Sequence, residues 1–176
     1  MIQYTIEQAR EQDLVKLASI ERAAAALFPN SVITPEERDS VVPIEQLVEA
    51  RLQGRLWVAL TQQREPVGFI IAALEHGSGF IVEVNVLPDH QGRGLGRALI
   101  QSVVKWACKE GLSRVTLTTF SEVPWNAPFY ERLGFCRIDR SQLTAELARK
   151  LDDEKHRGLR GRVAMERIID ASPARR

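Results

Sequence analysis

Residues 86 to 99 of the chain read Val86-Leu87-Pro88-Asp89-His90-Gln91-Gly92-Arg93-Gly94-Leu95-Gly96-Arg97-Ala98-Leu99. The apolar run from Phe80 to Leu87 is typical of a β-strand, and Leu95 to Glu110 carries apolar residues at helical spacing. Glycines between a strand and a helix let the backbone turn tightly. The N–H groups at the positive end of the helix dipole are then free to face an anion. The pattern therefore predicts a phosphate-binding loop.

Two other phosphate loops do not fit these residues. The dinucleotide pattern G-x-G-x-x-G requires glycine where Arg97 stands if counting starts at Gly92, and where Leu99 stands if it starts at Gly94. The Walker pattern fails because no Gly-Lys-Ser/Thr follows. These failures disfavour a nucleotide-binding module. A glycine turn that only begins a helix is the plain alternative, and three glycines within five residues, each costly to order, argue against it.

The composition is that of an ordinary globular protein. The chain has 176 residues, 44% hydrophobic and 27% charged, which predicts a single domain over residues 1–176. A net charge of +1 creates no field that would attract nucleic acid or an anionic membrane, so neither partner is expected. Cys108 and Cys136 lie in apolar stretches and are predicted to be core residues, without metal-ligand spacing, so no metal is predicted. Without a signal peptide or an apolar run of about 20 residues, we expect a cytoplasmic protein.

Apolar runs separated by turn residues define the expected secondary structure. We expect strands over 3–8, 56–60, 67–74, 80–87, 115–120, 135–138 and 162–168. We expect helices over 11–27, 43–52, 95–110, 125–133 and 141–156, and a loop over 31–39. A hairpin-rich block of strands comes first and strands then alternate with helices, so the predicted fold class is α+β, or mixed α/β.

The glycine loop resembles the cofactor-binding motif Q/R-x-x-G-x-G/A of the GNAT N-acetyltransferase superfamily, with Gln91, Gly94 and Gly96 at its fixed positions. A second block, Phe129-Tyr130-Glu131-Arg132-Leu133-Gly134-Phe135, resembles the downstream Y-x-x-L-G-F signature of that family. The likeness covers roughly residues 67–137. It implies a central, mostly antiparallel twisted sheet of about six or seven strands flanked by helices, splayed between the strands at 80–87 and 115–120.

The resemblance also implies an enzyme that transfers an acetyl group from acetyl-CoA to a primary amine by direct attack in a ternary complex. The pyrophosphate would bind the amides of residues 91–97, and the pantetheine arm would lie along residues 84–86 like an added strand. The family often has asparagine seven residues before the tyrosine, where Val123 stands here; Asn126 is four residues before it. The expected cofactor-binding residues are Val84, Asn85, Val86, Gln91, Gly92, Arg93, Gly94, Leu95, Gly96, Arg97 and Asn126.

Amide formation requires a base for the amine, a donor for the oxyanion and an acid for the thiolate. Glu83 is the candidate base, because it is the only ionisable residue of its strand and burial would raise its pKa. The alternative is a carboxylate on the wet face, although Asn85 shares its face and suggests a polar groove. The resemblance makes the Val86 N–H the oxyanion donor and Tyr130 the proton donor. The alternative for Tyr130 is a packed ring with a wet hydroxyl.

The acceptor side is less determined by the sequence. Five residues could line it, although solvated charges, an exposed turn residue or core packing explain each at least as well: Glu21, Phe28, His76, Glu122 and Trp125. The acceptor amine could belong to a small molecule, an amino acid or a protein N-terminus, and a homodimer is allowed. The alternative function is a non-catalytic CoA-binding or sensing module, and the presence of both Glu83 and Tyr130 favours the enzyme.

Overall fold

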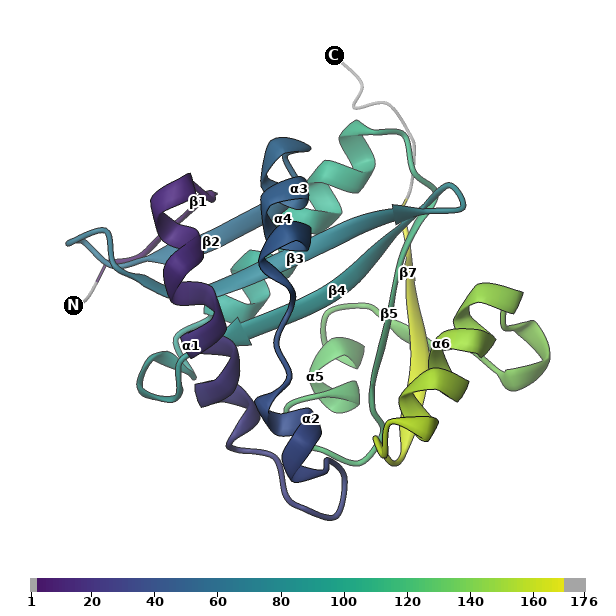
Figure 1. Ribbon diagram of the computed structural model, residues 1–176. Helices are drawn as coiled ribbons and strands as arrows, with labels where there is room; N and C mark the ends of the chain where they lie inside the picture. Colours follow the sequence, from purple (N-terminus) through teal and green to yellow (C-terminus); the bar gives the residue numbers. More distant parts are fainter. Residues whose placement is uncertain (1–2, 170–176) are drawn as a thin grey trace.

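A computed structural model describes residues 3–169 of the chain (Figure 1). Seven strands form one sheet in the order β1-β2-β3-β4-β5-β7-β6. Their bounds are β1 Thr5–Gln8, β2 Leu56–Leu60, β3 Pro66–Glu75, β4 Ser78–Val86, β5 Arg114–Phe120, β6 Cys136–Arg137 and β7 Arg162–Ile168. Every neighbouring pair is antiparallel except β4 and β5, which are parallel. The mixed α/β class and the mostly antiparallel sheet are therefore confirmed.

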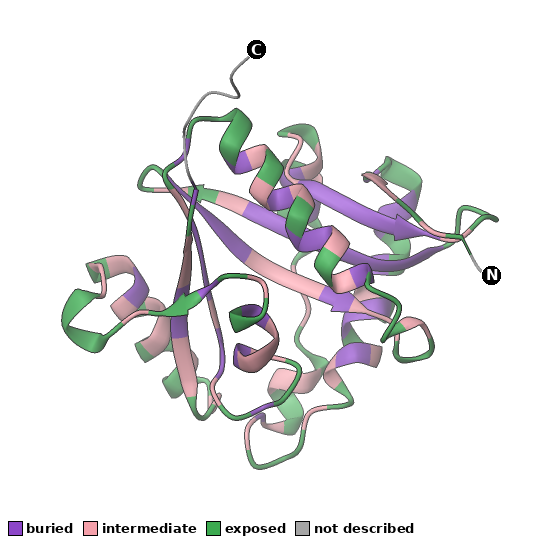
Figure 2. Ribbon diagram, turned by 180° about the vertical axis from the view of Figure 1, so that it is seen from behind, coloured by how far each residue is buried: buried purple, intermediate pink, exposed green. Residues whose placement is uncertain are grey.

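Helices cover both faces of this sheet. They are α1 Leu14–Ala25, α2 Pro35–Asp39, α3 Ile44–Leu52, α4 Leu95–Lys109, α5 Ala127–Glu131 and α6 Ala145–His156. Short 3₁₀ turns lie at Glu11–Asp13, Pro88–His90 and Arg140–Gln142. In Figure 1, α1 and α3 lie in front of β2 to β4, and Figure 2 shows α4 across the opposite face. No helix in residues 3–169 is both long and apolar enough to cross a membrane.

The central strands are buried on both faces because their apolar side chains alternate between two cores. Val58 and Phe69 belong to the core under α1 and α3. Trp57 and Ile70 belong to the core under α4. Successive residues of a strand point to opposite faces, so continuous apolar runs fill both cores. The sheet is thereby packed between the two helical layers, and β4 lies inside it between β3 and β5.

The strands β4 and β5 pair only at one end. Gly79 lies opposite Val115 and Phe80 opposite Thr116, and no further pair follows although both strands continue. Figure 1 shows the two strands diverging beyond this point. The predicted splay between residues 80–87 and 115–120 is confirmed, and it leaves one edge of β4 without a neighbouring strand.

An extra residue in β4 changes which face its side chains take. Ile71 of β3 lies opposite Glu83, whereas Ala72 lies opposite Ile81, so Val82 forms a β-bulge. Residues directly opposite in an antiparallel pair share a face. Because Ile71 belongs to the core under α1, Glu83 points to the α1 side of the sheet.

Two expectations from the sequence are wrong. Residues 35–39 form α2, where Thr34 Oγ1 accepts a hydrogen bond from Glu37 N–H at 3.3 Å and Pro35 begins the helix; five residues are too few to show a period. Both cysteines are exposed. Cys108 follows Ala107, the last residue of the buried stripe of α4, and so turns away from it. Cys136 lies on the two-residue edge strand β6.

Candidate active site

The splay opens into a cleft of about 760 Å³. Both predicted catalytic residues, Glu83 and Tyr130, line it. So do all the predicted cofactor-binding residues except Arg93, whose side chain Nη2 donates to Asp89 O at 3.3 Å on the outside of the loop. The side chain of Arg93 therefore does not line the cleft, and the predicted contact of Arg93 with the cofactor through its backbone amide stays a prediction.

The glycine loop presents free backbone N–H groups. Gly92 has φ of 71° and Gly94 of 80°, in the region that side chains disfavour. Within the part of the chain that the structure describes, the N–H groups of residues 92–97 donate to no acceptor. They lie at the start of α4, where the helix dipole favours negative charge, so the run suits a diphosphate. Gln91 is not part of it, because its N–H donates to Pro88 O at 3.2 Å and closes a 3₁₀ turn.

The third glycine of the loop has a different purpose from the first two. A Cβ atom at Gly92 or Gly94 would meet nothing within 4 Å. A Cβ atom at Gly96 would lie 3.3 Å from Cζ of Phe129, closer than most real Cβ contacts. Gly96 thus allows α4 to approach α5 closely, while Gly92 and Gly94 provide the left-handed backbone.

The open edge of β4 faces the cleft at Val84 and Val86. Leu87 N–H donates to Val67 O at 2.8 Å, and paired positions alternate along an antiparallel ladder. The N–H groups of Val84 and Val86 therefore point away from β3, towards the side where β5 has diverged. Gln91 Nε2 donates to Val86 O at 3.1 Å, so the Gln91 side chain fixes the loop to this edge. Such an edge suits an extended chain that carries amide groups.

The Glu83 side chain lies in the cleft and not on the outer wet face. Asn85 is buried beside it and donates from Nδ2 to Glu83 Oε1 at 3.1 Å. Burial raises the pKa of Glu83, while the charge of Arg162 and the Asn85 hydrogen bond oppose the rise. A carboxyl with a raised pKa is suited to accept a proton near neutral pH.

Tyr130 is buried at the start of the Y-x-x-L-G-F block, in α5. Its ring makes edge-to-face contacts with Phe129 and Phe135, with ring centres 5.5 and 5.8 Å apart. Its hydroxyl makes no hydrogen bond within residues 3–169 and is not among the fully buried unpaired atoms, so it is accessible from the cleft. Burial and the charge of Glu83 raise the pKa of Tyr130, so the phenol keeps its proton.

Asn126 fixes the position of α5. Its Oδ1 accepts a hydrogen bond from Thr119 Oγ1 at 2.7 Å, and its backbone carbonyl accepts from Tyr130 N–H at 3.0 Å. The residue therefore joins α5 to β5 while it lines the cleft. The shifted spacing of this asparagine still brings it to the site.

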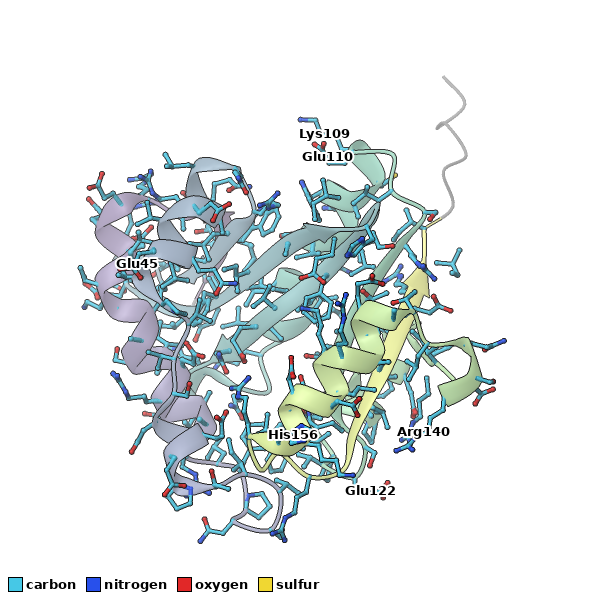
Figure 3. All side chains as sticks on the ribbon, turned by 45° about the vertical axis from the view of Figure 1, so that its right-hand side comes forward. Glu45, Lys109, Glu110, Glu122, Arg140 and His156 are labelled. Carbon is cyan, nitrogen blue, oxygen red and sulfur yellow. The ribbon has the colours of Figure 1, made fainter. Side chains whose placement is uncertain are left out.

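Three of the five acceptor-side candidates line the cleft: Glu21, Phe28 and Trp125. The other two do not. His76 lies in the turn between β3 and β4, with Nε2 3.6 Å from Glu146 Oε1. Glu122 is exposed after β5, at the edge of the molecule in Figure 3. Glu21 is buried in α1, and its burial together with the charge of Glu83 raises the pKa of Glu21 to about 8.

Sequence reasoning missed the ion pair between Arg162 of β7 and Glu154 of α6. Arg162 Nε lies 2.9 Å from Glu154 Oε2, Nη2 lies 3.0 Å from Oε1, and the guanidinium stacks over Phe120 at 4.6 Å. Figure 3 shows α6 alongside β7 at this wall. The two residues lie outside the recognised motifs, and β7 carries Glu166 and Arg167 as well as Arg162, so no local pattern singles Arg162 out.

A second ion pair joins two segments that are far apart in the sequence at one wall of the same cleft. Arg157, after α6, donates to Glu37 of α2 through Nε at 2.9 Å and also through Nη2. Arg160 N–H donates to Val32 O at 2.9 Å beside it. The segment before α2 is therefore held against the turn between α6 and β7, and the two form one wall of the cleft.

Curated relatives match part of the chain. The protein named peptidyl-lysine N-acetyltransferase YjaB from Salmonella typhimurium is 34% identical over 102 residues, which cover 57% of this chain and 63% of the relative. The namesake from Escherichia coli is 28% identical over 101 residues, with the same coverage. The chain thus spans less than two thirds of the length of these relatives.

Solved structures share the fold. The PaiA N-acetyltransferase from Thermoplasma acidophilum, in complex with coenzyme A, has a TM-score of 0.72 at 16% identity and covers 94% of this chain and 99% of its own. The N-acetylglutamate synthase from Neisseria gonorrhoeae, with coenzyme A and N-acetyl-glutamate, has a TM-score of 0.70 at 16% identity, over 95% of this chain and 35% of its own.

The profile of the Acetyltransferase (GNAT) family matches residues 17–135. This range holds most of α1, the splayed strands, the glycine loop and α5, and so includes most of the cleft. The chain therefore belongs to the acetyltransferase (GNAT) family.

Proposed function

We propose that this protein transfers the acetyl group of acetyl-CoA to a primary amine in a ternary complex. One observation carries the proposal: the free N–H groups of residues 92–97, the open edge of β4, and the side chains of Glu83 and Tyr130 converge on one cleft. Each of these features meets a separate demand of the reaction. A non-catalytic CoA-binding module would need only the first two.

Acetyl-CoA binds as a co-substrate in this proposal. Its diphosphate accepts hydrogen bonds from residues 92–97, and its pantetheine arm pairs with the β4 edge at Val84 and Val86. The Val86 N–H donates to the carbonyl oxygen of the thioester as it becomes an oxyanion. Asn85 acts through its hydrogen bond to Glu83, because its own backbone faces β3.

The transfer then needs proton movements at two side chains. Neutralising an alkylammonium costs about 4.6 kcal/mol at pH 7, and Glu83 accepts that proton. The amine nitrogen attacks the thioester carbon, the C–S bond breaks, and Tyr130 donates its proton to the departing sulfur. The attacking nitrogen loses its second proton to the medium as the amide forms, the phenol regains a proton from the medium, and Glu83 releases the proton that it accepted. In total, an ammonium ion and acetyl-CoA give an acetamide, coenzyme A thiol and one proton.

The acceptor in this proposal is an amine on a small molecule or a peptide. One curated relative is named a peptidyl-lysine N-acetyltransferase, which supports a peptide acceptor. One protein of similar fold is named an N-acetylglutamate synthase, which supports a small-molecule acceptor. The expected cytoplasmic location and the homodimer stay predictions.

The proposal is tested by thiol release from acetyl-CoA with a panel of amines, in parallel with calorimetric binding of coenzyme A. We expect coenzyme A binding and amine-dependent thiol release that Tyr130→Phe and Glu83→Gln both reduce strongly. Binding without turnover on any amine would leave only the CoA-binding module. Absence of coenzyme A binding by folded protein would contradict the proposal altogether.

A further inference from the structure

Glu21 is a buried carboxyl that the transfer chemistry does not use. It lies on α1, is only 8% exposed, and has the core residues Leu17, Ile20 and Ala24 on the same helix. It lines the same cleft as Glu83, from α1. A carboxylate in such surroundings is costly to keep charged unless it is hydrogen-bonded or paired with an opposite charge.

One oxygen of Glu21 is already occupied and the other is not. Oε2 accepts a hydrogen bond from Val42 N–H at 3.0 Å, which holds the side chain in place. Oε1 makes no hydrogen bond with any group in residues 3–169. It is also not among the fully buried unpaired atoms, so it remains accessible from the cleft. The structure thus presents one fixed, open acceptor at this wall.

The charges around Glu21 are unbalanced in favour of an incoming cation. Glu83 of β4 faces it, and the charge of Glu83 disfavours ionisation of Glu21. Arg22 acts from the same helix and is exposed. Arg162 of β7 binds Glu154 and Thr118 through Nε and Nη2, and its charge also acts on Glu83, but it is not among the charges that act on Glu21. Two neighbouring carboxyls repel each other when both are ionised, and a cation between them would remove that repulsion.

We propose that Glu21 and Glu83 together bind the acceptor in its ammonium form, so that Glu21 is an acceptor-binding residue that selects alkylamines. This rests on the proposed function. The ammonium donates one N–H to Glu21 Oε1 and another to Glu83, and it displaces any proton the pair holds. Glu83 then takes the proton that is removed before attack. Amines that are uncharged at neutral pH gain nothing from Glu21.

Two isomeric amines separate charge recognition from shape. Benzylamine is an alkylamine and is protonated at neutral pH, whereas 4-methylaniline has the same atoms but is an arylamine and is neutral. The kinetic constants kcat and KM are measured for both at saturating acetyl-CoA, with the wild type, Glu21→Gln and Glu21→Asp. Glu45→Gln is the matched control, because Glu45 is an exposed carboxylate on α3 outside the cleft. If an isomer is not acetylated, its inhibition constant against the best acceptor of the panel replaces KM.

We expect Glu21→Gln to raise the KM, or the inhibition constant, for benzylamine about 10- to 100-fold. This is the effect of losing a hydrogen bond between charged groups. The constants for 4-methylaniline and acetyl-CoA should stay unchanged. Glu21→Asp should restore part of the loss, and Glu45→Gln should behave as the wild type. Gln keeps an oxygen for Val42 N–H, so the fold is preserved, and melting temperature verifies this.

An equal change in KM or inhibition constant for both isomers in Glu21→Gln, or no change for benzylamine, would overturn the inference while the proposed function stands. A wild type that acetylates no amine at all would overturn both.

Discussion

Glu83 lies directly opposite Ile71 in the β3–β4 ladder, one residue beyond the bulge at Val82. Without the extra residue, alternation from Ile81 would direct Glu83 into the apolar core under α4, where a carboxyl has no partner. The bulge directs it instead to the side where α1 carries Glu21. The extra residue Val82 therefore determines that the Glu83 side chain points into the cleft.

The glycine loop can be tested at Gly94. An alanine there must adopt φ near 80°, which costs on the order of 1–2 kcal/mol, and the strain acts on the N–H groups proposed to hold the diphosphate. We expect Gly94→Ala to weaken coenzyme A binding measured by calorimetry. Gly77→Ala is the matched control, because Gly77 has φ of 76° and equally open space but lies in the β3–β4 turn. Equal losses of affinity in both variants would mean that the loop acts only through stability.

The Tyr130 hydroxyl can be tested by removing one oxygen. We expect Tyr130→Phe to lower kcat by about 10²–10⁴ because general acid catalysis is lost, with acetyl-CoA affinity unchanged. Tyr4→Phe is the control, since Tyr4 does not line the cleft and its hydroxyl already bonds His90 Nδ1 at 2.8 Å. A lowered melting temperature with normal kcat in Tyr130→Phe would instead indicate a packing role for the ring.

Stability should depend on pH through Glu21. Its folded pKa of about 8 lies above the ordinary 4.5, so the folded state holds a proton that the unfolded state has lost. Wild-type stability therefore falls as pH rises from about 4.5 to about 8. Glu21→Gln removes this dependence, so its melting temperature should exceed that of the wild type increasingly over that range. A difference in melting temperature that is constant with pH would contradict the raised pKa.

Arg162 should set the pH range over which Glu83 acts as a base. Its positive charge lowers the pKa of Glu83, opposing the effect of burial. Arg162→Gln removes that charge, so Glu83 ionises at higher pH, and the acid side of the kcat/KM profile should move to higher pH. Arg162→Lys keeps the charge and should move it less. Identical profiles in Arg162→Gln and the wild type would mean that Arg162 only holds α6 against β7.

The sequence predicted the parts of the site that local patterns encode. The strand before Pro88, the glycine loop and the helix from Leu95 follow from periodicity and glycine spacing, and the splay followed from the family resemblance. The ion pair of Arg162 with Glu154 could not be predicted, because it depends on how α6 packs on β7.

The bulge at Val82 shows a second limit of sequence reasoning. An apolar run from Phe80 to Leu87 looks the same with or without an unpaired residue, and the register becomes visible only against β3. Gly96 shows a third limit. A glycine is needed at this position because a Cβ atom would crowd Phe129 on α5. Phe129 is a neighbour in space, and the spacing of residues within the loop does not reveal it.

The role of Glu83 as base is tested most directly by the pH profile of kcat/KM, measured for the wild type and for Glu83→Gln with one alkylamine acceptor. Burial raises the pKa of Glu83, so the wild-type rate should rise as Glu83 loses its proton. Glu83→Gln should be slower by about 10²–10⁴ at neutral pH and should recover partly at high pH, where the free amine becomes abundant. A variant with the wild-type rate and the same profile at every pH would show that the cleft carries out transfer without Glu83.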